Sequence, residues 1–138
     1  MQNGYQYFFA EASFAQGEYA SALKLMADAV SRKASPQIEA LRLRRYAYYL
    51  ATVPDEDLRD GKRAAEFAQA SLAKVPSAEA LIALACAQAE LQDFDKALAT
   101  IEKAAKSKLS EAKAKQVAEL KAKFQRQQPH RAVKASAG

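Results

Sequence analysis

Few side chains in this sequence could do chemistry, and the most suggestive of them lie in the acidic stretch DEDLRDG. Asp55 and Asp57 have the separation of two ligands in a calcium-binding loop, and Glu66 stands where the closing glutamate would be. The third ligand position is Arg59, however, and Asp60 occupies the place where the loop requires glycine. We therefore predict no metal site, but a polar connector whose Asp60 caps the helix that follows.

The other candidates for catalysis are single residues. His130 is the only histidine and Cys86 the only cysteine, and neither has a base or an orienting carboxylate beside it in the sequence. Nucleophilic and acid–base catalysis need such partners. The sequence also contains no glycine-rich phosphate loop. We predict that the protein is not an enzyme and that it uses no cofactor.

The positive charge is concentrated at one end of the chain. Residues 1–100 carry 11 Lys and Arg against 13 Asp and Glu, a net −2, whereas residues 101–138 carry 10 against 3, a net +7, which together give +5. This distribution predicts no basic groove through the body, and without interleaved aromatics nucleic acid is not the expected partner. Instead, Glu and Lys four residues apart predict a solvated helix with self-paired charges: Glu102–Lys106, Glu111–Lys115 and Glu119–Lys123.

The elements that must position these residues are helices. Half of the 138 residues are apolar, and four glycines and four prolines are too few to break an alanine-rich chain often. The breakpoints predict an all-α fold with hairpins at about 5–33, 36–74 and 77–106, Ser35 and Ser77 serving as N-caps. A capping helix at about 110–127 completes domain 1–127, and the basic tail 128–138 is expected to be disordered.

Small residues recur at one spacing in the second helix of each hairpin. Small side chains on one helix face let neighbouring helix axes approach closely, so this spacing predicts that the hairpins stack. The recurring sets are Ala22, Met26 and Ala29; Ala64, Ala68 and Ser71; and Ala97, Ile101 and Ala104.

Aromatic residues gather at the other end of the chain. All six tyrosines and three of the six phenylalanines lie in the first 50 residues. We expect Phe9, Tyr19 and Tyr46 to pack between hairpins, and other rings of this group to meet a partner or a second copy of the chain.

The segments GEYASALKLMADAV and QDFDKALATIEKAA resemble the tetratricopeptide repeat (TPR) family in their turn, aromatic and small-residue register. Ala64 and Ala97 are 33 residues apart, close to the family period, while Ala22 and Ala64 are 42 apart because of the loop at Pro54. The stretch YYLATVPDEDLRDGKRAAEFAQASLA looks like a bacterial variant with a proline-acidic loop in the middle repeat. The resemblance implies three stacked antiparallel helix-turn-helix repeats in a short right-handed solenoid, closed by the capping helix.

The resemblance also implies a protein- or peptide-binding groove on the concave face, formed by the first helix of each pair. Members that hold chaperone tails use lysine and asparagine, where this sequence has Glu11 and Tyr48. The predicted partner therefore offers aromatic or aliphatic anchors and an acid for Arg44. Carried over by position, the groove residues are Tyr7, Glu11, Phe14, Arg44, Tyr48, Ile82, Cys86 and Glu90.

The expected function is thus a non-catalytic binding scaffold. Two alternatives remain open: a self-assembling structural module or part of a larger solenoid, with homo-oligomers formed through the aromatic N-terminal face, and an adaptor for nucleic acid or anionic surfaces through the basic tail. No membrane span and no signal peptide are expected, which predicts a cytoplasmic location.

Overall fold

The computed structural model describes the backbone of residues 2–132 and the side chains of residues 7–132. This part of the chain is helical and contains no strand. Its helices are α1 (Gln2–Ala15), α2 (Tyr19–Val30), α3 (Pro36–Thr52), α4 (Gly61–Lys74), α5 (Ala78–Glu90), α6 (Phe94–Ala105) and α7 (Glu111–Gln125). None of the helices described is both long enough and apolar enough to cross a membrane.

Polar side chains fix where these helices begin. The side chains of Ser35, Asp60 and Ser77 each accept the backbone N–H three residues ahead, as their places in the sequence predict. Asp93 and Ser110 cap α6 and α7 in the same way. Because the N-terminal N–H groups of a helix have no partner within the helix, these bonds set the connections between helices.

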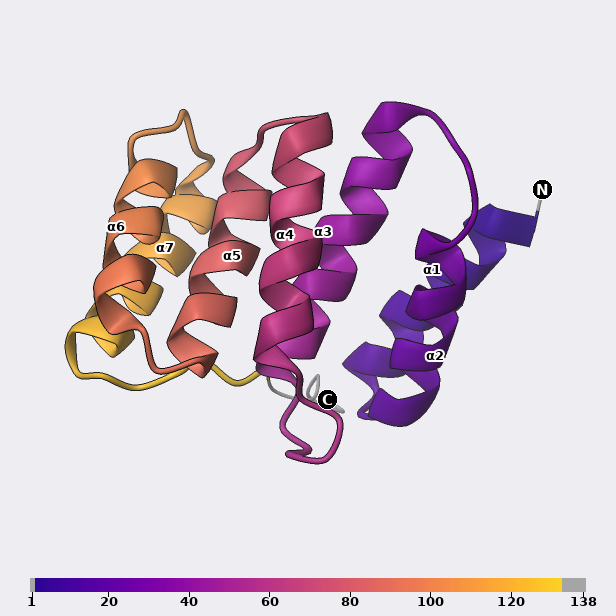
Figure 1. Ribbon diagram of the computed structural model, residues 1–138, viewed down its shortest axis with the longest axis horizontal. Coiled ribbons are helices and arrows are strands. Elements are labelled where there is room, and N and C mark those ends of the chain that lie inside the picture. Colours follow the sequence, from indigo (N-terminus) through magenta and orange to yellow (C-terminus); the bar gives the residue numbers. More distant parts are fainter. Residues whose placement is uncertain (1, 133–138) are drawn as a thin grey trace.

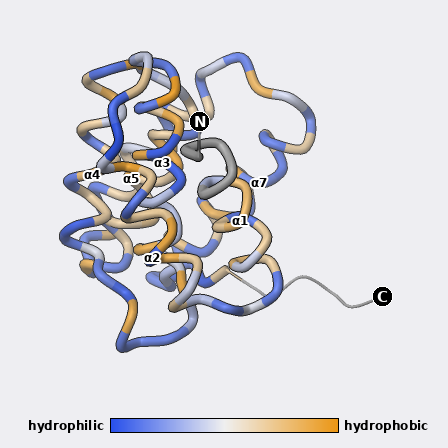
Figure 2. The backbone as a smooth tube through the Cα atoms, turned by 90° about the vertical axis from the view of Figure 1, so that its right-hand side faces the viewer, coloured by the Kyte–Doolittle hydropathy of each residue, from blue (hydrophilic) through white to orange (hydrophobic). Residues whose placement is uncertain are grey.

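The helices pack side by side along the longest axis of the molecule (Figure 1). Helices α1 and α2, α3 and α4, and α5 and α6 form packed pairs; α3 and α4 also contact α5, and α7 covers α6. In the side view, α1 and α7 lie on the opposite side from α2 and α4 (Figure 2). The molecule therefore has one face built on α2, α4 and α6 and another that α1 and α7 flank.

The recurring small residues lie where the helices meet. Ala22, Ala64 and Ala97 are fully buried, as are the other members of their sets. Ser71 also donates its hydroxyl hydrogen to the carbonyl of Ala40 at 2.8 Å, joining α4 to α3. The predicted burial of these sets is confirmed, and it explains why alanines stand where leucines would hold the helices apart.

Two expectations about side chains are wrong. Phe9 is 61% exposed and Phe8 76% exposed, because both lie on a face of α1 that no other described helix covers. The basic helix does not pair its own charges: Glu102 instead binds Lys121 across α6 and α7 at 2.8 Å, and the Lys123 ammonium lies 3.0 Å from a ring nitrogen of His130. Contacts between elements thus replace the contacts along one helix that the spacing suggested.

The structure also differs from the expectation for the start of the C-terminal tail. Gln127 takes a left-handed conformation, with φ of 58°, and turns the chain back at the end of α7. The segment then passes the end of α5 and reaches α3 (Figure 1), where the N–H of Ala132 donates to the carbonyl of Thr52 at 2.8 Å. Residues 133–138 of the predicted tail lie outside the described residues.

Candidate functional site

A groove of about 660 Å³, here called the central groove, is hollowed into the described structure. It opens between α1, α3 and α7, with residues of the C-terminal segment at one end. It is lined by Glu11, Phe14, Ala15, Arg45, Tyr48, Tyr49, Gln116, Lys123, His130, Arg131 and Ala132.

One wall of the central groove is an aromatic and ionic contact between α1 and α3. Phe14 stacks on Tyr49 with ring centroids 4.0 Å apart and planes 10° apart. The guanidinium of Arg45 lies over the ring of Tyr49 at 5.2 Å and donates to Oε1 of Glu11 at 3.2 Å. Cation–π and charge-assisted contacts hold this side chain in one orientation, so Arg45 presents a fixed charge to the groove.

The end of the groove is formed by the chain itself. His130 lies between Tyr48 and Lys123, with Nε2 3.0 Å from the tyrosine oxygen and Nδ1 3.0 Å from the lysine nitrogen. An ammonium group can only donate, so Nδ1 accepts from Lys123 and the imidazole is neutral with its proton on Nε2. Burial, then Lys123 and then Arg131, lower the pKa of His130 to about 4.

Glu90 joins this segment to the connector between α3 and α4. Its carboxylate pairs with Arg59 at 3.0 Å and with Arg131 at 2.8 Å. Gly61 leaves room for it, since a Cβ there would lie 3.0 Å from Cγ of Glu90. Arg59 also donates to the carbonyl of Val53 and so holds the acidic connector in its conformation. In a calcium-binding loop, this position would be occupied by an oxygen ligand.

The predicted groove residues are only partly brought together. Glu11, Phe14 and Tyr48 line the central groove, although Phe14 is just 6% exposed. Tyr7 lies outside its lining and donates to Oε2 of Glu11 at 3.4 Å, and burial raises the pKa of Tyr7. Glu90 lies behind the groove as the partner of Arg131.

The remaining predicted residues lie toward α5. Arg44 and Ile82 line an adjoining hollow of about 20 Å³ with Lys113. Arg45, Tyr48 and Gln116 line both this hollow and the central groove. Cys86 is 1% exposed within the core, where burial raises the pKa of its thiol to about 12. A thiol with so high a pKa is a packing residue rather than a nucleophile at neutral pH.

Sequence reasoning missed Arg45 and every contribution from α7 and the segment after it. Arg44 and Arg45 precede Tyr48 by four and by three residues, so both lie about one helical turn from it. Helical periodicity therefore could not decide which of the two arginines shares the face of Tyr48. Lys123, His130 and Arg131 bring basic and hydrogen-bonding groups to the groove. The charge distribution predicted no basic groove through the body; the central groove nevertheless takes Lys123 and Arg131 from the basic end of the chain, beside Glu11, because α7 forms one of its walls.

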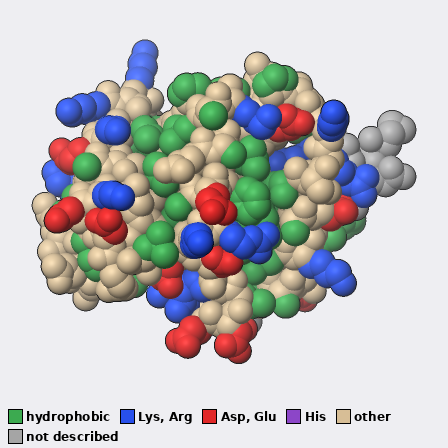
Figure 3. Space-filling view, viewed as in Figure 1, with side chains coloured by type: hydrophobic (Ala, Val, Ile, Leu, Met, Phe, Trp, Pro, Cys, Tyr) green, Lys and Arg blue, Asp and Glu red, His purple; other side chains and the backbone are tan. Residues whose placement is uncertain are grey.

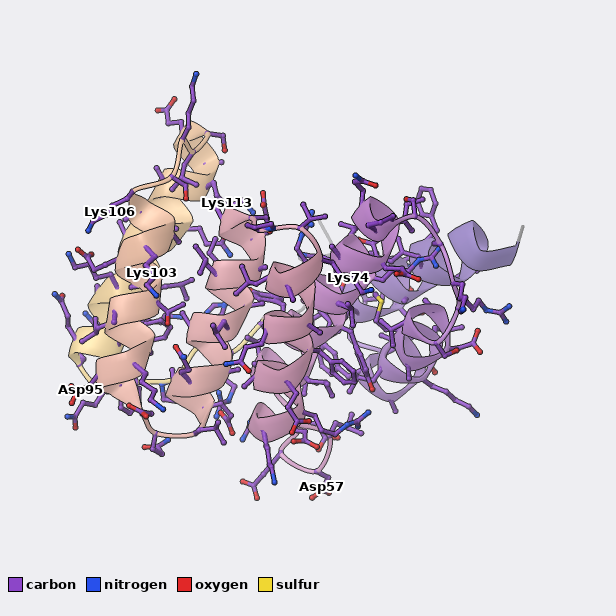
Figure 4. The ribbon with its side chains drawn as sticks, turned by 45° about the horizontal axis from the view of Figure 1, so that its top comes forward. Asp57, Lys74, Asp95, Lys103, Lys106 and Lys113 are labelled. Atoms are coloured by element: carbon purple, nitrogen blue, oxygen red, sulfur yellow. The ribbon has the colours of Figure 1, made fainter. Side chains whose placement is uncertain are left out.

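Charge elsewhere on the molecule is less concentrated. On the face built on α2, α4 and α6, acidic and basic side chains are interspersed (Figure 3). Lys103, Lys106 and Lys113 lie around α6 and α7, far from Asp57 in the connector between α3 and α4 (Figure 4). In the described part of the chain, no three His, Cys, Asp or Glu side chains are grouped to hold a metal ion.

The chain matches no protein-family model and no curated protein. The central groove brings together a fixed guanidinium, aromatic rings, a neutral imidazole and an ammonium group around an open hollow. Such a lining can hold a peptide by ring contacts and by hydrogen bonds to its polar groups.

Proposed function

We propose that the protein is a non-catalytic scaffold of three TPR-like repeats and a capping helix, which binds a peptide segment of a partner protein in the central groove. The buried small residues at the helix contacts and the pairing of consecutive helices support the repeat architecture. In such a stack the first helices of the pairs, here α1, α3 and α5, line the concave face.

The observation that carries the binding proposal is the preorganised wall between α1 and α3. Arg45 is held by Glu11 and by the rings of Tyr48 and Tyr49 before any ligand arrives. Side chains that are already ordered lose little entropy on binding, and arginine and tyrosine are the residues that contribute most at protein interfaces. Tyr48, which is partly exposed, offers contact area, and the buried Phe14 supports the wall by stacking on Tyr49. Arg45 takes the acid-binding part that the sequence suggested for Arg44.

A selection from a phage-displayed random peptide library tests this proposal. The immobilised full-length protein is the bait, and each enriched peptide is then measured against Arg45→Ala and against Arg63→Ala. Arg63 is a matched control, because its guanidinium lies over Tyr46 and Phe67 on the other face of the molecule. We expect enriched peptides to lose about tenfold in affinity with Arg45→Ala only. Peptides that bind all three proteins equally would place the binding surface elsewhere.

A second candidate function is self-association through α1. Phe8 and Phe9 are the most exposed large apolar residues described, and they are adjacent on one helix. Exposed aromatic pairs of this kind are typical of protein contact surfaces. Sedimentation velocity over a wide concentration range tests this function. The average molecular mass of the wild-type protein should rise with concentration, and that of the double variant Phe8→Ser/Phe9→Ser should stay constant. Ala12→Ser, on an exposed position of the same helix, is the control.

A further inference from the structure

The C-terminal residues 128–132, here called the strap, make contacts with the groove that resemble those of a bound peptide. The strap contains no helical residue, and it crosses from α7 to α3 past the end of α5 (Figure 1). Three consecutive residues each use a different kind of contact. His130 meets Tyr48 and Lys123, Arg131 meets Glu90, and Ala132 meets the backbone of α3.

The backbone contact completes the end of α3. The last carbonyl groups of a helix have no partner within the helix. Those of Tyr49 and Leu50 accept from Val53 and Asp60, and that of Thr52 accepts from Ala132 at 2.8 Å. Thr52 is fully buried, so its carbonyl needs a donor, and an extended peptide can supply one whatever its sequence.

The side-chain contacts add chemical selectivity. Glu90 provides the acceptor for a guanidinium, and the 2.8 Å pair with Arg131 remains partly exposed. Tyr48 and Lys123 together fit a neutral ring that accepts at one nitrogen and donates at the other. A small residue follows, packed at the edge of the main core. The sequence His-Arg-Ala satisfies all three requirements in order.

We propose that the strap is an intramolecular ligand of the central groove, and that an external peptide which enters this end must displace it and supply the same chemistry: a neutral hydrogen-bonding ring, a guanidinium and a small residue. The partner is thus a peptide segment with a basic residue next to a ring, and the strap weakens its binding by occupying the site. The inference deepens the proposed function, but the docking of the strap is testable without any external partner.

The first test uses the full-length protein and its single histidine. In an NMR titration the one set of imidazole signals reports whether His130 is docked. The titratable and charged groups that line the two hollows beside this ring come from three helices and the strap itself: Glu11 from α1, Arg45 and Tyr48 from α3, Glu119, Lys123 and Arg126 at α7, and Arg131, which pairs with Glu90 of α5. We expect a pKa well below the ordinary value of 6.5. An unshifted titration would mean that the strap is free and would overturn the proposal.

The second test supplies the strap from outside. The probe is a synthetic peptide of residues 126–132, acetylated and amidated at its ends and labelled with a fluorophore. It is titrated by fluorescence anisotropy into wild-type protein and into a full-length variant with His130→Ala and Arg131→Ala. Arg32→Ala, which changes an arginine paired with Asp28 just after α2 and away from the strap, is the control protein. A peptide with the same two alanines is the control probe.

We expect the peptide to bind the strap-disabled variant at least about tenfold more tightly than wild type, because the attached strap competes at a high effective concentration. The alanine peptide should bind at least about tenfold more weakly, as when a hydrogen bond to a charged group is lost. Equal binding to both proteins, or equal binding of both peptides, would overturn the proposal. Since this assay needs no selected ligand, its failure is distinct from failure of the library selection.

Discussion

Replacement of Glu90 by glutamine removes one negative charge that two arginines share, while shape and hydrogen-bonding capacity are nearly kept. The Glu90 side chain is 19% exposed, Arg59 is 11% exposed and Arg131 is 32% exposed. The contact with Arg59 is therefore the more sheltered one, and solvent screens the contact with Arg131 more strongly. Arg59 keeps its bonds to the carbonyls of Val53 and Pro54, so it is not left without acceptors.

The expected loss follows from these two contacts. A hydrogen bond to a charged group contributes about 1.5 to 3 kcal/mol when sheltered, and an exposed ion pair contributes about 0 to 1 kcal/mol. Because the glutamine oxygen can still accept one neutral bond, worth about 1 kcal/mol, we expect Glu90→Gln to lower the free energy of unfolding by about 2 kcal/mol. Arg131→Ala alone should lower it by less than about 1 kcal/mol.

Urea denaturation followed by circular dichroism measures both variants and their combination. The double variant should be less destabilised than the sum of the single ones, since both changes remove the same contact. A loss below about 0.5 kcal/mol for Glu90→Gln would refute the reasoning, because it would mean that the carboxylate contributes no more than a surface charge. Full additivity would refute the contact between Glu90 and Arg131.

Three further predictions concern the packing, the turn after α5 and the strap. Ala97→Leu, at a fully buried contact of α6, should destabilise the protein by about 1 to 3 kcal/mol in the same assay, whereas Ala99→Leu on the exposed side of that helix should change stability little. Gln92→Gly should stabilise by about 1 kcal/mol, because Gln92 has a φ of 67°, which costs a side-chain-bearing residue energy; no gain in melting temperature would contradict this. The strap should dock with full strength above pH 6.5, because His130 is then neutral both docked and free. As the pH falls below 6.5 the free ring gains a proton that the docked ring excludes, so docking should lose up to about 1.4 kcal/mol of free energy per pH unit. The loss should end near pH 4, where the docked ring is protonated as well. Proteolysis by trypsin after Arg126 and Arg131 should therefore accelerate between pH 7 and pH 5, relative to cleavage of a model peptide; a constant ratio would contradict the sign.

The helices could be predicted from the sequence because their signals are local. The starts of α3 and α4 match the prediction, since Ser35 with Pro36, and Asp60, fix the first turn within a few residues. The buried faces followed from the spacing of Ala64, Ala68 and Ser71. Both the capping residues and the spacing of buried residues can be read from a short stretch of consecutive residues.

The central groove could be predicted only in part because its remaining contacts join distant residues. Glu11 and Tyr48 were found because the resemblance to tetratricopeptide repeats placed them in a groove by position, and both line it. His130 meets Tyr48 across 82 residues of chain, and no periodicity reports on such a contact. Lys123 in turn contacts His130. The polar, proline-containing composition of the strap is typical of a disordered segment. The strap nevertheless contacts the helices, because Arg131 pairs with Glu90 and the N–H of Ala132 donates to the carbonyl of Thr52. Phe9 shows the reverse case, since an aromatic at an apparent packing position found no described neighbour to cover it.

The most direct measurement of the central claim is the affinity of one library-selected peptide for wild-type protein, Arg45→Ala and Arg63→Ala, measured by isothermal titration calorimetry at one salt concentration. Both variants lose the same side chain from above two aromatic rings, but only Arg45 lines the central groove. A peptide-binding groove between α1, α3 and α7 predicts about tenfold weaker binding to Arg45→Ala and unchanged binding to Arg63→Ala. Unchanged binding to Arg45→Ala, or an equal loss in both variants, would contradict it.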